Sequence, residues 1–434
     1  MFVKRTGKLL SLVLMLLLIV ISVVGATGGK EAPNEGPTKI YAGKTITLLI
    51  HPALYNAAGG DTGIKQEFEK RTGARVDVVT APIPEHSEKA MLDFIAKTAR
   101  YDVIAMQSGD MTKEFCKFFL PLDSFISNSP EWKGEDIIQS LMDMAKIDGK
   151  QLGIPYRWTQ VVTYYRKDLL SKANVKVPTK VEDILEVGKA LTMDTDGDGK
   201  TDVYGFIAQG KAPEELSHSW LTAFYGLGGR ILDENGKSGL NTPAGKKAAQ
   251  LWLDLYTQGV LPPDFFAWGR DDTINAMAQG KGAMGNFVAS YYGNFFSSGI
   301  NKDQIGYAIT AGGGVNRGGG WNLVVNKDSK NTDVAWALVK ELTSVENQIH
   351  MAVKWANGPV RTSTFESKEF KSLWPQAEEM KIATQMQIVD PPIKQTPQIH
   401  TAITEELTAI MMGKKSVDQG MQDLDRRVNR LLEN

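Results

Sequence analysis

The segment from Asp194 to Gly205 carries acidic side chains at a spacing that suits a metal ion. It reads DTDGDGKTDVYG, and carboxylates occupy the first, third, fifth and ninth positions of an EF-hand loop, namely Asp194, Asp196, Asp198 and Asp202. The twelfth position, where such a loop needs a bidentate glutamate, is Gly205. We therefore predict a structural turn that can hold calcium, with local Asx-type hydrogen bonding as the alternative.

Residues for enzymatic catalysis form no recognisable local motif. The histidines are His51, His86, His218, His350 and His400, and no two have the H-E-x-x-H spacing. No G-x-S-x-G elbow occurs, and Cys116 stands between aromatic residues in EFCKFF, which favours a buried, inert thiol. A carboxylate pair for glycoside hydrolysis stays open, because such pairs meet in space and not in sequence.

Aromatic side chains are the more informative feature. Five of them adjoin Gly, Pro, Ser or Arg in predicted loops or strand ends: Trp158, Trp220, Trp268, Tyr291 and Trp321. A flat ring presented from a loop stacks on the apolar face of a sugar or another planar ligand. The alternative is that each ring packs beneath its own loop, but with five candidates we expect some to face one cleft.

The N-terminus has the pattern of a secretory signal peptide. Lys4, Arg5 and Lys8 precede an apolar run over 9–24 and small residues at 24–26, and this run is shorter than a bilayer span. We predict a signal peptide over 1–26 and a flexible Gly- and Pro-rich leader over 27–43. With no Cys near the cleavage point, a periplasmic or extracellular protein is favoured over a lipoprotein, and retention of the run as a membrane anchor is the alternative.

Charge and cysteine content exclude several classes. Loss of the three basic residues of the signal peptide takes the formal net charge from −1 to −4, so no broad basic surface for nucleic acid is expected. A single cysteine allows no intrachain disulfide, and the fold must depend on its hydrophobic core.

Strands and helices alternate along the chain after the leader. Strands are expected at 44–50, 74–79, 101–106, 204–208 and 321–326, and helices at 64–73, 85–99, 181–191, 244–256 and 332–343. This alternation predicts an α/β fold in which helices cover a parallel sheet. Two glycine-rich segments, 312–320 and 357–361, are interpreted as tight turns or hinges.

Seven segments occur in the order and spacing of one known family. They are TGARVDVV, YDVIAM, FLPLD, LGIPYRW with TYYRKDLL, QGKGAMGNF, GGGWNLVVNKDSKNTDVAWALVKELTS and NGPVRTST. Over essentially the whole mature chain the sequence resembles the extracellular solute-binding proteins of ABC importers, in the sugar-binding group (family 1) that includes maltose-binding protein.

The resemblance implies a two-lobe periplasmic-binding-protein fold of type II with the ligand cleft between the lobes. On this chain the N-terminal lobe would comprise 44–155 plus 321–356, and the C-terminal lobe 156–320 plus 357–434. Connecting segments would fall near 156–158, 318–320 and 358–360.

The function that the resemblance implies is a monomeric receptor without catalytic activity and without a cofactor other than structural calcium. It would capture a mono- or oligosaccharide by lobe closure and deliver it to the transmembrane subunits of an ABC permease. The alternatives are a polyol, glycerol phosphate or another non-sugar solute and, from a different class, a secreted carbohydrate-active enzyme.

The resemblance also indicates ligand-binding residues. Gln107, Ser108 and Asp110 follow the strand 101–106, where relatives hydrogen-bond sugar hydroxyls, although Asp110 could instead cap a helix that begins near Met111. The other candidates are Tyr156, Trp158, Trp220, Trp268, Asn286, Tyr291, Trp321 and Arg361. For Arg361 an ion pair that holds the two lobes together is the alternative role.

Overall fold

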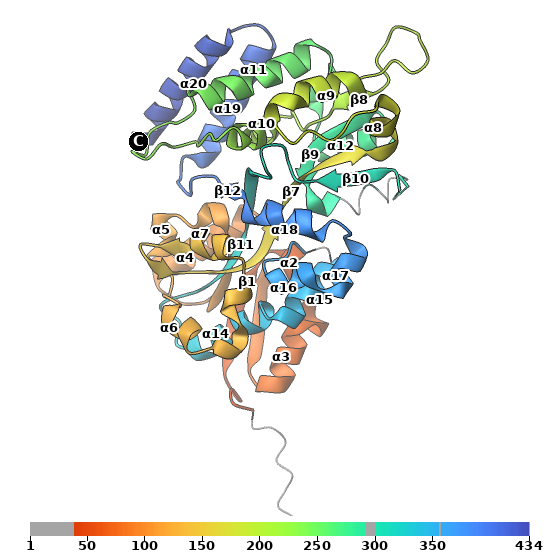
Figure 1. The fold of residues 1–434 in the computed structure, drawn as a ribbon. Coiled ribbons are helices and arrows are strands. Elements are labelled where there is room, and N and C mark those ends of the chain that lie inside the picture. The colour runs from red at the N-terminus through yellow and green to blue at the C-terminus, as the bar shows by residue number, and fades with distance from the viewer. Residues whose placement is uncertain (1–38, 292–294, 296–299, 302, 356, 434) are drawn as a thin grey trace, which may run out of the picture. The chain divides into compact units, whose positions relative to one another are not determined.

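Two β-sheets organise the part of the chain that the computed structural model describes, which is residues 39–291, 295, 300–301, 303–355 and 357–433. From Tyr41 onward these residues belong to one compact unit (Figure 1). The predicted signal peptide and the predicted leader up to residue 38 lie outside the described residues. Within the described part, no helix combines the length and the apolar character needed to cross a bilayer.

The first sheet has the strand order β12-β11-β3-β1-β2, and β6 also pairs with β11. Its strands are β1 (Thr45–Ile50), β2 (Arg75–Thr80), β3 (Val103–Gln107), β6 (Ile154–Thr159), β11 (Asn316–Val325) and β12 (Gln387–Val389). β1 runs parallel to β2 and β3, whereas β11 runs antiparallel to β3 and β6. The predicted strand–helix alternation is confirmed here, and the helix α3 (Ile64–Thr72) is followed by Gly73, whose φ of 76° is left-handed.

The second sheet has the order β10-β7-β9-β8. It consists of β7 (Val161–Arg166), β8 (Tyr204–Phe206), β9 (Gly282–Val288) and β10 (Ile305–Ala308), and a separate hairpin pairs β4 (Lys146–Ile147) with β5 (Lys150–Gln151). The chain passes from the first sheet to the second at Gln160, between β6 and β7. The predicted assignment of whole segments to two lobes stays a prediction.

Helices surround both sheets. The first part of the chain contributes α2 (Pro52–Ala57), α3 (Ile64–Thr72), α4 (Glu85–Ala96), α5 (Lys113–Cys116), α6 (Asp123–Ser127) and α7 (Gln139–Met144). The middle contributes α8 (Lys167–Ala173), α9 (Ile184–Leu191), α10 (Glu215–Gly226), α11 (Pro243–Thr257) and α12 (Arg270–Ala278). The last part contributes α14 (Thr332–Leu342), α15 (Val345–Trp355), α16 (Thr362–Glu366), α17 (Lys368–Leu373), α18 (Ala377–Gln385), α19 (Thr396–Met411) and α20 (Val417–Leu432).

Separate apolar cores stabilise the two sheets. Leu48, Val103 and Leu323 belong to the core of the first sheet, which α3 and α14 help to cover. A second core lies among α9, α10, α11, α19 and α20, where Trp252 and Leu407 are almost completely buried (Figure 1). Burial of this apolar surface holds the chain together without a disulfide, since Cys116 is a free thiol.

The glycine-rich segment 312–320 combines two backbone conformations. Gly312–Gly314 have positive φ angles and form a turn, as predicted. For residues 318–320 the turn is wrong, because they lie within β11, and the alternative of a hinge stays a prediction. A Cβ atom at Gly320 would stand 2.3 Å from the Arg157 carbonyl oxygen, so this strand needs glycine for close packing and not for a turn.

Candidate functional site

Polar side chains gather where the parallel strands of the first sheet end. β1 is followed by His51, and β3 ends at Gln107 and continues into Ser108. Because β11 runs antiparallel, its residue Trp321 pairs with Gln107 at the same edge. The carboxyl edge of a parallel sheet is the usual ligand-binding position in open α/β folds.

A pocket of about 310 Å³ opens at this edge. Its lining is drawn from β3 and the turn after it, β6, β7, β9, β11, β12 and the start of α19: Gln107, Ser108, Gly109, Thr159, Val161, Val288, Arg317, Gly318, Gly319, Gly320, Trp321, Val389, Asp390 and Thr396. Both sheets contribute, because β7 and β9 belong to the second sheet and the other strands to the first. The volume lies near the lower end of the range for small-molecule sites.

Three predicted ligand-binding residues line this pocket, namely Gln107, Ser108 and Trp321. The Ser108 hydroxyl accepts a hydrogen bond of 3.1 Å from the Gly320 N–H, which ties the turn after β3 to β11. The Trp321 ring packs between His51 and His86, with ring centroids 5.5 and 5.6 Å away. Its position is therefore fixed by packing before any ligand arrives.

Asp110 lies behind the pocket lining. Its carboxylate accepts a hydrogen bond of 2.6 Å from the Ser87 hydroxyl, and burial raises its pKa. The alternative role as a helix cap is wrong, because Thr112 caps α5 and accepts from the Phe115 N–H.

The predicted residues of the first connecting segment are buried. The Tyr156 hydroxyl lies 3.3 Å from the Met351 sulfur and burial raises the pKa of this tyrosine. Trp158 is also fully buried, and the predicted loop position is wrong because it lies within β6. Neither lines the larger pocket, although Trp158 lines a smaller one beside it.

Trp220 is also not in a loop. It lies in α10, is completely buried in the core among the helices, and stacks on Phe224 with a centroid separation of 4.7 Å and an interplanar angle of 12°. The helix places the two rings one turn apart, which explains the stacking. The structure does not bring Trp220 to the pocket.

Three further candidates on and around β9 do not line the pocket: Trp268, Asn286 and Tyr291. Asn286 accepts a hydrogen bond of 2.7 Å from the Thr163 hydroxyl, across the β7–β9 pair. The Tyr291 hydroxyl accepts from the Gln209 side chain at 3.2 Å. Trp268 is partly buried and packs against the core of the second sheet.

Arg361 lies away from the pocket and is completely buried. Its guanidinium donates to the carbonyls of Thr343, Lys133 and Trp132 at 2.6, 2.7 and 3.0 Å. It also pairs with the Asp136 carboxylate at 3.3 Å. The predicted ion pair is therefore present, and its function in this structure is to connect three segments of the chain.

An ion pair that no sequence pattern predicts lies in the pocket wall. Arg317 donates to Asp390 at 2.6 Å, and Asp390 also accepts from the Tyr225 hydroxyl at 2.7 Å. Burial alone would raise the pKa of Asp390, but the Arg317 cation and the His400 contact hold it well below its usual range. No motif marks these residues, since they are about seventy positions apart and only the β11–β12 pairing joins them.

Behind Asp390, three side chains form an array that resembles a nucleophile, a base and an acid. His400 Nε2 lies 3.0 Å from Asp390 and His400 Nδ1 lies 2.8 Å from the Ser217 hydroxyl. Ser217 is completely buried, and its hydroxyl also donates to the Glu214 carbonyl. A nucleophile needs access to its substrate, so this array supports Asp390 and α10 structurally.

Cys116 is buried, and burial raises the pKa of its thiol to about 11. The prediction of an inert thiol agrees with this environment.

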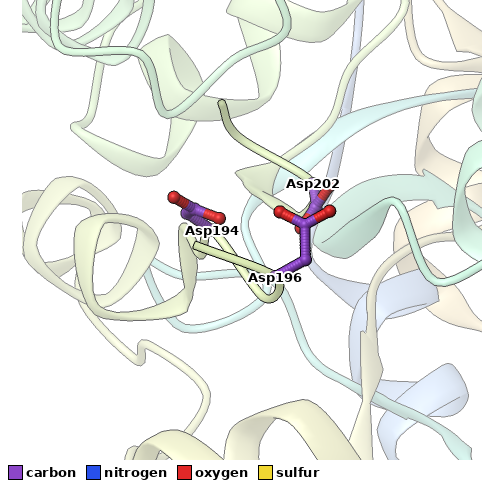
Figure 2. A group of neighbouring side chains, drawn as sticks. All are labelled: Asp194, Asp196 and Asp202. Atoms are coloured by element: carbon purple, nitrogen blue, oxygen red, sulfur yellow. The ribbon is translucent and has the colours of Figure 1, made fainter. Parts of the chain in front are cut away.

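The acidic loop is shown in Figure 2. Oxygens of Asp194, Asp196 and Asp202 come within 4.8 Å of one another, whereas Asp198 pairs with Lys200 at 3.4 Å. Asp194 accepts hydrogen bonds from the N–H groups of Gly197 and Gly199, and these bonds lower its pKa. The loop therefore has the predicted Asx-type bonds, with three of the four predicted carboxylates near one point.

Comparison with known protein families identifies the family of this chain. The model of the bacterial extracellular solute-binding proteins matches residues 55–349, which is more than half of the chain. The chain belongs to this family.

Individual relatives and solved structures are consistent with the assignment of this solute-binding protein to the family. A probable amino-acid ABC transporter periplasmic-binding protein of Sinorhizobium fredii is 22% identical over 400 residues, which cover 90% of each chain. Among solved structures, the sugar-binding protein MalE from Xanthomonas citri has a TM-score of 0.79 at 20% identity and covers 90% of this chain and 98% of its own. A solute-binding protein from Agrobacterium radiobacter in complex with ribitol has a TM-score of 0.72 at 21% identity, with 90% and 99% covered.

These structures share the two-lobe fold that was predicted for the solute-binding protein, and the predicted family and fold class are confirmed.

Proposed function

We propose that this solute-binding protein is a receptor of an ABC importer that captures a carbohydrate outside the cytoplasm and delivers it to the membrane permease. The observation that carries the proposal is the pocket at the carboxyl edge of the first sheet, with the Gln107 amide, the Ser108 hydroxyl and the Trp321 ring in its wall. Amide and hydroxyl groups both donate and accept hydrogen bonds, which suits sugar hydroxyls, and an aromatic ring suits the apolar face of a sugar.

Capture by closure follows from the composition of this wall. Residues of the second sheet, Val161 and Val288, line the same pocket as residues of the first. A ligand that contacts residues of both sheets is bound most tightly when the two sets of residues are close together. Binding therefore shifts the population toward a closed form. The closed form presents a different surface from the empty receptor, and a permease can distinguish the two by this difference.

A polyol is the second candidate ligand. The pocket volume of about 310 Å³ favours a small solute over a long oligosaccharide. Among proteins with this fold, one was solved with ribitol, which carries hydroxyls like a sugar but has no ring. The same hydrogen-bonding groups would serve either ligand, and only the stacking role of Trp321 differs between them.

We propose that the protein binds its ligand without changing it. The Ser217, His400 and Asp390 array is the one arrangement of catalytic type that we find in the described residues, and its serine is completely buried. A monomer in the periplasm or outside the cell, without a nucleic-acid partner, completes this proposal.

A thermal-shift screen over monosaccharides, oligosaccharides and polyols tests the proposal. A ligand at roughly 100 times its Kd should stabilise the protein by about 2.7 kcal/mol and raise Tm by roughly 3 °C. Chromatography of the incubated sugar should recover it unchanged. Turnover of a sugar, or the absence of a shift with every sugar and polyol while an amino acid gives one, would contradict the proposal.

The acidic loop is proposed to be a structural calcium site remote from ligand binding. Asp194, Asp196 and Asp202 would hold the ion, which would replace repulsion among three carboxylates by attraction. Addition of a chelator should therefore affect stability alone. Tm should fall or stay the same, and ligand affinity should change by less than about tenfold. A larger loss of affinity in a calorimetric titration with chelator would show that the loop takes part in ligand binding.

A further inference from the structure

Arg157 is a partly buried cation that has no hydrogen-bond or ion-pair partner within the described residues. Its Nε atom is buried and forms no hydrogen bond, and among the described residues its side chain makes no ion pair. Several other buried polar atoms also lack partners, but Arg157 is the only permanently charged residue among them. Burial lowers the pKa of the guanidinium, as expected for a charge withdrawn from water without compensation.

In the described part of the chain two arginines are fully buried, and both are compensated, whereas Arg157 is partly buried. Arg361 pairs with Asp136, and Arg166 pairs with Asp168 at 2.6 Å. Even partial withdrawal of a charge from water without an opposite charge is unfavourable, so an uncompensated arginine favours a partner that is not part of the protein. Functional sites are where such costs are retained.

The position of Arg157 connects it to the ligand pocket. Arg157 on β6 stands opposite Trp321 on β11, and Trp321 stands opposite Gln107 on β3. Directly opposite residues share one face of a sheet, so these three form a row across three strands, and two of them line the larger pocket.

Arg157 itself lines a smaller pocket, and Thr159 belongs to the walls of both pockets. The free space in this smaller pocket is about 10 Å³, enough for about one oxygen atom. Two more of its residues carry donors without acceptors, Trp158 at Nε1 and Asn357 at Nδ2, and both are almost completely buried. Because Trp158 projects from the face of β6 opposite to Arg157, the Arg157 guanidinium is the cationic donor on the face that carries Trp321, and it is complementary to an acceptor oxygen with negative charge.

The net charge beside Arg157 favours a monoanion. Burial and the nearby Arg157 cation lower the pKa of His51, and burial lowers the pKa of His86 to about 4. Both imidazoles around Trp321 are therefore neutral near pH 7, which leaves one full positive charge. A carboxylate carries one negative charge and matches the guanidinium in shape, whereas a phosphate monoester carries about −1.5 to −2.

We propose that Arg157 binds a carboxylate of the ligand, and that the ligand class is an acidic saccharide such as a uronic acid or an oligomer that ends in one. This inference rests on the proposed carbohydrate function and adds the chemical class of the ligand. The sugar ring would lie in the larger pocket against Trp321 and Gln107, and its carboxylate would reach Arg157 past Thr159.

Calorimetric titration with matched pairs of sugars tests the inference: galactose with galacturonate, glucose with glucuronate, and galactose 6-phosphate as the dianionic member. We expect each uronate to bind at least about tenfold tighter than its neutral partner and tighter than the phosphate. Arg157→Gln should reduce uronate affinity by about tenfold or more and neutral-sugar affinity by less than about threefold. Arg71→Gln, which removes an exposed arginine paired with Glu341, is the matched control and should change neither.

The outcomes separate this inference from the proposed function. Equal affinity for neutral and acidic sugars, unchanged in Arg157→Gln, would overturn the carboxylate site and leave the sugar receptor intact. Binding of simple amino acids but of no sugar, abolished in Arg157→Gln, would support the carboxylate site and overturn the sugar receptor.

Thermal unfolding of the ligand-free protein gives a test that needs no ligand. Arg157→Gln removes an uncompensated charge, so Tm should rise by about 1 to 2 °C. Arg361→Gln removes a charge that has four acceptors, so Tm should fall by at least about 4 °C. A fall in Arg157→Gln as large as that in Arg361→Gln would show that the protein itself compensates Arg157, and would overturn the inference.

Discussion

Replacement of Arg361 by methionine is expected to lower the free energy of unfolding by about 3 to 5 kcal/mol. Arg361 is completely buried and donates to three backbone carbonyls, and its ion pair with Asp136 is largely shielded from water. Methionine fills a similar volume but removes the side-chain donor from the Thr343 and Trp132 carbonyls, whereas Asp136 still accepts hydrogen bonds from Ser363. Each unsatisfied buried acceptor costs about 1 to 3 kcal/mol, so even partial entry of water leaves a large loss.

Denaturant unfolding followed by circular dichroism measures this loss. Arg75→Met is the control, because Arg75 is exposed and its contact with Asp77 should contribute less than about 1 kcal/mol. Ligand affinity of folded Arg361→Met should stay close to that of the wild type, since Arg361 does not line the pocket. A destabilisation below about 1 kcal/mol, or a loss of affinity without loss of stability, would assign Arg361 to the ligand site.

Trp220→Ala is expected to destabilise the fold by about 3 to 5 kcal/mol. Trp220 is completely buried in α10, and truncation removes its stacking on Phe224 and leaves a cavity among α10, α11 and α19. Thermal or denaturant unfolding of the variant measures the effect. Because Trp220 does not line the pocket, the affinity of the folded variant should change little.

Trp321→Ala is the matched comparison, because Trp321 lines the pocket and is also largely buried. It should weaken ligand binding by about 1 to 3 kcal/mol, which is roughly 5- to 150-fold in Kd. The pair therefore separates an aromatic side chain that contacts ligand from one that supports the core. Equal loss of affinity in both folded variants would show that Trp220 reaches the ligand, as its position in the sequence first suggested.

Local regularities explain why much of the fold was predictable. The strands around Leu48, Val76 and Ile104 are apolar on their buried positions, and Gly73 supplies the left-handed residue that ends α3. Hydrophobic periodicity and glycine conformation act over a few residues, so the sequence reports them directly. The order of motifs along the chain then identified the family, which the family model confirmed.

The candidate site was less predictable, because neighbouring residues in the sequence point in different directions. Trp158 and Arg157 are adjacent on β6, yet Trp158 is completely buried while Arg157 is only partly buried on the face that carries Trp321, since successive side chains of a strand point to opposite faces. Trp220 looked like a loop residue before a Gly-Gly pair, but α10 continues through it to Gly226. Tertiary packing overrides such local signals.

The sequence by itself determined the alternating α/β elements, the family, and the polar residues Gln107 and Ser108 at the end of β3, because each depends on residues that are close together in the chain. Only the tertiary structure decided which side chains share a pocket. Strand β11 brings Arg317 and Trp321 to residues of β3, β6 and β12 that are about 70 to 220 positions away, and Arg317 pairs there with Asp390. Charge balance in a buried site is a property of distances in space, and no spacing along a single chain specifies it.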